Sequence, residues 1–209
     1  MERVIAYVDG FNIYYGLRSK WWKRFYWLNI QKLAQQFIKS NQALIQTKYF
    51  TTIVKRPDDK RRRQAVFLDA LKLLPDFDIF YGQFLSEEIV CRVCGHTYTP
   101  YHEKMTDVNI SVELMTDALQ NRFDVALLIS ADSDLVGPVE TVQRLFPTKR
   151  VVAIFPPGRS SFALKQIAKA VLHIGHVDLA RSLFPDEIIR PDRVSLRRPT
   201  KWHSINYAA

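Results

Sequence analysis

The chain is poor in the features that mark several classes of protein. Its 209 residues include only two cysteines, Cys91 and Cys94, which are too few and too closely spaced for a disulfide scaffold. No hydrophobic run approaches the length of a membrane span, and the first residues, MERVIAYVDG, carry no signal-peptide pattern. We therefore expect a cytoplasmic protein with no membrane partner.

Glycine-rich phosphate-binding loops are missing as well. The chain contains neither the G-x-x-x-x-G-K-[ST] motif of P-loop NTPases nor the G-x-G-x-x-G motif of dinucleotide-binding folds. Asp9 is not followed two residues later by a second aspartate, and no strong Ser-His-Asp or Cys-His signature is present. These absences count against NTPases, dehydrogenases, aspartyl-phosphate phosphatases and hydrolases with a serine or cysteine nucleophile.

What the chain has in excess is positive charge, with a formal net charge of +9. Such an excess favours a polyanionic partner, and nucleic acid is the commonest one. The densest basic patch is Arg61, Arg62 and Arg63, which is either a solvated helix face or a contact for a phosphate backbone. Residues 185–209 carry further basic side chains among prolines, and we expect them to form an extended arm.

Short apolar runs alternate with amphipathic helical patterns through residues 1–184. Residues 4–8 (VIAYV) and 125–129 (VALLI) contain no charged residue, which is typical of parallel strands buried on both faces. The alternation predicts one α/β domain with a mainly parallel sheet between helices. Further strands are expected at 43–54, 77–85, 150–155 and 171–174, and helices at 29–39, 58–74, 105–119, 139–146 and 161–170.

Four aspartates stand where strands end or helices begin: Asp9, Asp107, Asp132 and Asp134. In open α/β sheets, ligands bind beyond the carboxyl ends of the strands. Three or four carboxylates in one cleft suit a hard ion such as Mg²⁺ or Mn²⁺, which activates water and stabilises charge on a phosphate. Structural alternatives remain for two of them, since Asp107 also suits a first helical turn and Asp134 an N-cap.

Two other segments each allow a functional and a structural interpretation. The aromatic cluster at residues 21–27 suits either base stacking or coverage of one end of the core, and the second is favoured. Residues 85–104 form an expected hairpin insertion containing a CxxC turn. Either its four candidate ligands hold a structural Zn²⁺ or the turn is reduced and metal-free, which the non-standard spacing favours. These candidates are Cys91, Cys94, His96 and His102.

Three segments, in this order, resemble the NYN domain family and in particular its LabA-like branch, within the PIN-like nucleases. They are YVDGFNIYYG, EKMTDVNISVELMTDA and ALLISADSDLVGPV, and the resemblance spans residues 4–176. It implies a PIN-like, Rossmannoid three-layer α/β/α sandwich, a divalent-metal cleft and endoribonuclease activity.

Matched to the family's motifs, the same four aspartates would be the metal ligands. Asn12 and Lys104 would position water or phosphate. Ala131 stands where the family usually has glycine, so the turn there must avoid positive φ. Glu113 is left out of the predicted site, because its helical offset from Asp107 places it on another face.

The leading hypothesis is a metal-dependent endoribonuclease whose RNA substrate is held by Arg61, Arg62, Arg63 and the C-terminal arm. One alternative is a non-catalytic RNA-binding adaptor of the same fold. Another is a small-molecule enzyme using the same cleft, with residues 21–27 lining a pocket. The sequence leaves open whether the chain forms a homodimer.

Overall fold

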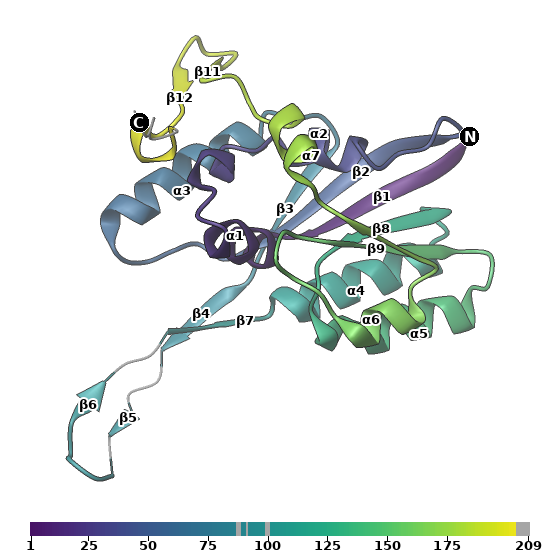
Figure 1. Ribbon diagram of the computed structural model, residues 1–209, viewed down its shortest axis with the longest axis horizontal. Helices are drawn as coiled ribbons and strands as arrows, with labels where there is room; N and C mark the ends of the chain where they lie inside the picture. The colour runs from purple at the N-terminus through teal and green to yellow at the C-terminus, as the bar shows by residue number, and fades with distance from the viewer. Residues whose placement is uncertain (87–88, 91, 99–100, 204–209) are drawn as a thin grey trace.

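The structure, a computed structural model, describes residues 1–86, 89–90, 92–98 and 101–203 (Figure 1). Its centre is a six-stranded sheet in the order β10-β9-β8-β1-β2-β3, and every pairing in it is parallel. The predicted parallel α/β sheet is therefore confirmed. Its strands are β1 (Glu2–Asp9), β2 (Gln42–Thr51), β3 (Phe77–Tyr81), β8 (Val125–Ile129), β9 (Arg150–Phe155) and β10 (Ala170–His173).

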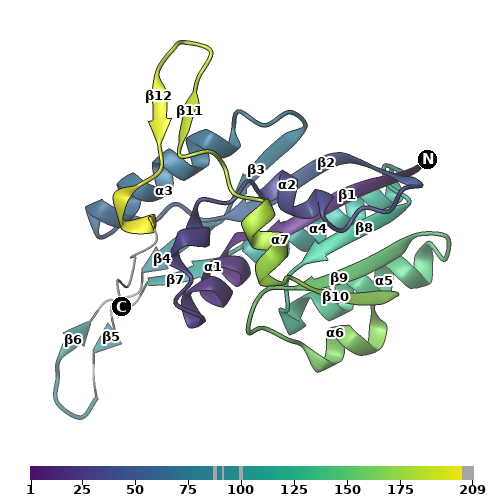
Figure 2. The same ribbon diagram turned by 45° about the horizontal axis from the view of Figure 1, so that its top comes forward.

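Helices cover both faces of this sheet (Figures 1 and 2). One layer contains α1 (Gly10–Ser19), α2 (Ile30–Gln35), α3 (Asp58–Leu71) and α7 (His176–Arg181). The other contains α4 (Thr106–Leu119), α5 (Val136–Leu145) and α6 (Phe162–Ile167). Within the described residues, no helix is long and apolar enough to cross a bilayer.

The two faces of the sheet build two separate cores. Alternate residues of a strand point to opposite faces, so Val4, Ala6 and Val8 pack toward α1 and α3. Ile5 and Tyr7 pack toward α4 instead. Continuing this alternation along β1 places Asp9 on the α4 side of the sheet edge.

The start of α1 depends on a close approach between strand and helix. Asp9 is the N-cap of α1, and its carboxylate accepts a hydrogen bond from the backbone N–H of Asn12. A Cβ atom on Gly10 would lie 2.5 Å from the Tyr49 hydroxyl and 2.8 Å from the Phe50 carbonyl oxygen. Glycine is therefore needed at this position because β2 packs directly against it.

The insertion between β3 and α4 is an antiparallel ribbon that projects from the body (Figure 1). In it β4 (Gln83–Ser86) pairs with β7 (Tyr101–Lys104), and β5 (Ile89–Val90) pairs with β6 (Thr97–Tyr98). The zinc alternative for the CxxC turn falls partly outside the described residues and stays a prediction. Cys94 is free and exposed, while Cys91 and the His102 side chain lie outside what is described.

The prediction of an extended C-terminal arm is wrong for residues 187–202. Here β11 (Glu187–Ile189) and β12 (Ser195–Arg197) form an antiparallel hairpin, followed by the 3-10 turn η3 (Thr200–Trp202). Trp202 is only 9% exposed and packs against Tyr26 and Phe67. Burial of this indole gives the segment an apolar anchor that its basic, proline-containing composition does not suggest.

Candidate metal centre

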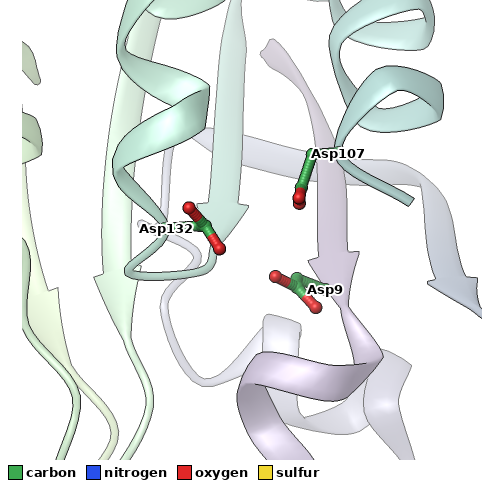
Figure 3. Close-up of side chains that lie close together, drawn as sticks. All are labelled: Asp9, Asp107 and Asp132. Carbon is green, nitrogen blue, oxygen red and sulfur yellow. The ribbon is translucent and has the colours of Figure 1, made fainter. Parts of the chain in front are cut away.

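Three of the four predicted acids converge at the carboxyl edge of the sheet (Figure 3). Asp9 ends β1, Asp107 lies in the first turn of α4, and Asp132 follows β8. One carboxylate oxygen from each lies within 4.8 Å of the others. Asp9 is 3% exposed, whereas Asp107 and Asp132 are partly accessible.

Asp9 and Asp132 are joined through Ser130, a residue that sequence reasoning missed. The Ser130 hydroxyl donates to Asp9 Oδ2 at 2.9 Å and accepts from the backbone N–H of Asp132 at 3.1 Å. Ser130 is completely buried, so this hydroxyl holds the two acids in a fixed relation. The only signal in the sequence is its position two residues after Leu128. Because side chains alternate along a strand, Ser130 is expected on the same face as Leu128, which packs toward α4.

The turn after β8 is organised by Asp132. Asp132 is the N-cap of the 3-10 turn η2 (Ser133–Leu135), and its Oδ1 accepts from the Asp134 backbone N–H at 3.0 Å. Asp134 is exposed and lies outside the acidic group, so the structure does not bring in the fourth predicted ligand. The alternative of Asp134 as an N-cap is also wrong, since Asp132 has that position.

Asn12 supports the same turn. Its side-chain oxygen accepts from the Ala131 backbone N–H at 3.1 Å. Ala131 is not among the residues with positive φ, which agrees with the expectation drawn from its replacing glycine. Asn12 therefore fastens the turn that carries Asp132 to the start of α1.

Asp107 enters the site through a tight junction between β7 and α4. Helix α4 begins at Thr106, and the preceding Met105 has a left-handed backbone with φ of 82°. Thr106 is thus the first helical residue, and Met105 is the N-cap. A left-handed backbone is uncommon for a residue with a side chain, and it lets the chain reverse from strand to helix at one position.

A buried ionic network beneath the acids joins α4 to the sheet. Lys48 Nζ lies 2.6 Å from Asp117 Oδ2 and 2.6 Å from Glu113 Oε2. The Tyr7 hydroxyl donates to Asp117 at 2.6 Å. Burial, followed by the Asp117 charge, raises the pKa of Tyr7 well above its usual value. Omitting Glu113 from the predicted site agrees with its pairing here, but nothing in the sequence pointed to Lys48.

The predicted substrate-binding arginines lie on α3, in the opposite helical layer from α4 (Figure 1). Arg61 pairs with Asp58 at 3.2 Å and Arg63 with Asp59 at 2.7 Å, while Arg62 is exposed. The hydrogen bond from Arg63, then that from Lys201, lowers the pKa of Asp59 to about 2. The Lys104 side chain lies outside the described residues.

The aromatic cluster at residues 21–27 serves mainly the core, as the favoured interpretation held. Phe25 and Trp27 are completely buried, and Trp22 and Tyr26 pack against the same core. Trp21 differs, being 81% exposed.

Comparison with known proteins gives the family. Residues 3–175 match the NYN domain. The chain belongs to the NYN domain family, which is part of the PIN-like superfamily.

Two further comparisons extend this finding. The chain is 23% identical to 6-hydroxy-3-succinoylpyridine 3-monooxygenase HspA of Pseudomonas putida, over 96% of this chain and 75% of that protein. It also resembles the crystal structure of a Vibrio parahaemolyticus protein of unknown function. That match has a TM-score of 0.53 and 18% identity, and covers 88% of this chain and 96% of the other, so it supports the fold alone.

The acidic group of this NYN domain is compatible with a divalent ion. Oxygens that share one Mg²⁺ stand roughly 3.0 to 4.2 Å apart, because each Mg–O distance is about 2.1 Å and the coordination is octahedral. Oxygens within 4.8 Å of one another reach that spacing with little side-chain movement. Carboxylates are hard ligands, which Mg²⁺ and Mn²⁺ prefer to the softer ligands of zinc sites.

Proposed function

We propose that this NYN domain is a divalent-metal-dependent endoribonuclease that hydrolyses phosphodiester bonds in RNA. The observation that carries the proposal is the convergence of Asp9, Asp107 and Asp132 from three separate elements at the carboxyl edge of the sheet. Membership of a PIN-like family and the net charge of +9 support a nucleic-acid substrate.

In this proposal the three aspartates hold Mg²⁺ or Mn²⁺. A bound ion there would lower the pKa of a water molecule and stabilise the charge that develops on the phosphate. Ser130 and Asn12 keep the carboxylates in place through the hydrogen bonds described above. Lys104 and the basic residues 61–63 of α3 contact the RNA backbone, and we expect this contact to weaken with salt.

The experiment is cleavage of a fluorescently labelled single-stranded RNA in the presence of Mn²⁺. A bound metal contributes several kcal/mol of transition-state stabilisation, so Asp132→Asn should slow cleavage by about 10³-fold, and EDTA should stop it. Asp69→Asn is the matched control, since the Asp69 side chain is largely exposed on α3 and, among the described residues, forms an ion pair only with Lys72. Cleavage that persists unchanged with EDTA or in Asp132→Asn contradicts the mechanism.

The non-catalytic adaptor predicts a different result with the same proteins. Wild-type protein and Asp132→Asn would then bind RNA equally and in a salt-sensitive way, with no cleavage by either. A filter-binding assay alongside the cleavage assay separates the two functions.

A second candidate function is chemistry on a small heteroaromatic molecule. The similarity to a protein named as a monooxygenase of 6-hydroxy-3-succinoylpyridine, over 96% of this chain, favours it. If it holds, a pyridine carboxylic acid should bind the protein in the presence of metal and should compete with RNA for the acidic cleft. Independent binding of both molecules would count against this function.

A further inference from the structure

A hollow lies on the face of the sheet that is opposite to α4. It is a cavity of about 240 Å³ between α1, the 3-10 turn η1 (Lys23–Tyr26), α3 and η3. Its wall is rich in aromatic rings, and Tyr14, Tyr26 and Trp202 form a continuous part of it. The Tyr14 and Tyr26 ring centroids are 5.1 Å apart, and those of Tyr26 and Trp202 are 5.9 Å apart.

The charged groups of this cavity all have one sign. Arg18, Arg56, Lys60 and Arg63 line it, and none of its described lining residues is acidic. Arg63 is paired with Asp59, but Arg18, Arg56 and Lys60 form no ion pair within the part of the chain that the structure describes. Burial raises the pKa of Tyr26 to about 12, so its hydroxyl adds no negative charge at neutral pH.

Residues that line the cavity are direct neighbours, along the chain or across the sheet, of residues at the acidic group. Gly10 and Phe11 line the cavity and directly follow Asp9. Thr51 also lines it and follows Phe50, the residue of β2 that pairs with Asp9. A strand whose phosphate lies at the acids would therefore need only a short extension to place a neighbouring group in the cavity.

The C-terminal segment completes the wall. Arg198 donates to the carbonyl oxygens of Arg24 at 2.6 Å and of Trp202 at 2.7 Å, which fastens η3 over η1. Lys201 reaches Asp59 of α3 at 3.1 Å. The family match ends at residue 175, so Trp202 is the part of the wall that lies outside the matched domain.

Aromatic walls and unneutralised cations together select a flat ring that carries a negative group. Bases stack on aromatic side chains with little regard to sequence, while Lys and Arg attract phosphate. A cavity of roughly 150 Å³ already accommodates benzene, so this one has room for a base.

We propose that this cavity is a nucleotide subsite, in which one unpaired base of the RNA strand lies among Tyr14, Tyr26 and Trp202. Arg56 and Lys60 hold the adjoining phosphate. The inference rests on the proposed nuclease function, since it takes the ligand from the same strand. It assigns the folded C-terminal segment, through Trp202, a role in holding the nucleotide that lies beside the cleaved bond.

The test measures how the four nucleoside 5′-monophosphates bind to the full chain in the presence of EDTA. Binding is detected by tryptophan fluorescence and by calorimetry. Trp202 lies in the wall, so occupancy should change its emission. Nucleotides should bind at least about tenfold more tightly than ribose 5-phosphate, which lacks the base. Tyr14→Leu and Lys60→Ala should each weaken binding about five- to tenfold, and Lys32→Ala, an exposed lysine on α2, should not.

Equal affinity for nucleotides and ribose 5-phosphate, or no loss in Tyr14→Leu and Lys60→Ala, would overturn the subsite. So would tight binding of nicotinate without binding of any nucleotide, which would assign the cavity to small heteroaromatic acids. Because EDTA is present, the outcome is independent of cleavage. Nucleotide binding without RNA cleavage would support the subsite and contradict the nuclease function. RNA cleavage without nucleotide binding would support the nuclease function and contradict the subsite.

Discussion

The two faces of the central sheet use charge in opposite ways. Toward α4, the ion pair between Lys48 and Asp117 is buried beneath the acidic group, and the partly exposed Glu113 joins it. Toward α1 and α3, the core is aromatic and aliphatic, and the cations stand at the rim of the cavity. One face therefore fixes the positions of carboxylates, while the other leaves an open space with a positive border.

This difference has a physical reason. A group of acids that shares an ion must be held against mutual repulsion, which requires hydrogen bonds and buried counter-charges around it. A site for a stacked ring needs only an apolar wall and long-range attraction. The predictions below test this division, beginning with the largest expected effect.

Removing the buried cation on the α4 face should damage the fold most. Lys48→Met leaves Asp117, which is completely buried, without its closest cation, and should lower the free energy of unfolding by about 3–5 kcal/mol. Lys60→Met, at the exposed rim of the cavity, should change it by less than about 0.5 kcal/mol. Urea denaturation measures both. Similar losses in the two variants would show that the two faces do not differ.

Gly10→Ala should disturb both faces at once. The added Cβ would lie 2.5 Å from the Tyr49 hydroxyl in the cavity wall, on the residue next to Asp9. We expect a loss of about 1–3 kcal/mol in unfolding free energy. Gly137→Ala is the control, because nothing lies within 4 Å of its added Cβ. Thermal denaturation that shows no difference between the two would contradict the close packing at Gly10.

Ser130→Ala should act on the acidic group alone. It removes the donor to Asp9 Oδ2 and the acceptor for the Asp132 N–H, so Mn²⁺ affinity should fall by about 10–100-fold. Ser182→Ala removes another buried hydroxyl, one that donates to the Asp178 carbonyl in α7, and should leave Mn²⁺ affinity unchanged. Titration with Mn²⁺ followed by calorimetry compares them. Equal affinities would mean that Ser130 does not position the acids.

The smallest effect should come from an ion pair at the start of β1. Hydrogen bonds from Arg3 lower the pKa of Asp124 to about 2. Since an unfolded aspartate has a pKa of about 3.9, the stabilisation is present above that value and is lost as pH falls toward 2. The pair is partly exposed, so Asp124→Asn should cost no more than about 1 kcal/mol at pH 7. The urea midpoints of wild-type protein and Asp124→Asn should therefore differ at pH 7, and this difference should shrink at pH 2.5.

Much of the fold could be predicted, because its signals are local. The uncharged runs at residues 4–8 and 125–129 are the central strands β1 and β8, and their carboxyl ends deliver Asp9 and Asp132. The C-terminal hairpin escaped prediction because its order depends on Trp202 reaching Tyr26 and Phe67, far away in the chain. The composition of a segment indicates its local conformational preference, but it does not show which distant residues the segment will pack against.

The sequence by itself determined the alternation of strands and helices, and with it the edge of the sheet where acids gather. Only the tertiary structure decided that Ser130 joins Asp9 to Asp132, that Asp134 stays outside their group, and that a cavity opens beside α1. The reason is that periodicity is a property of neighbours along the chain. Contacts between hydroxyl and carboxylate, or between ring and ring, depend on how distant segments pack.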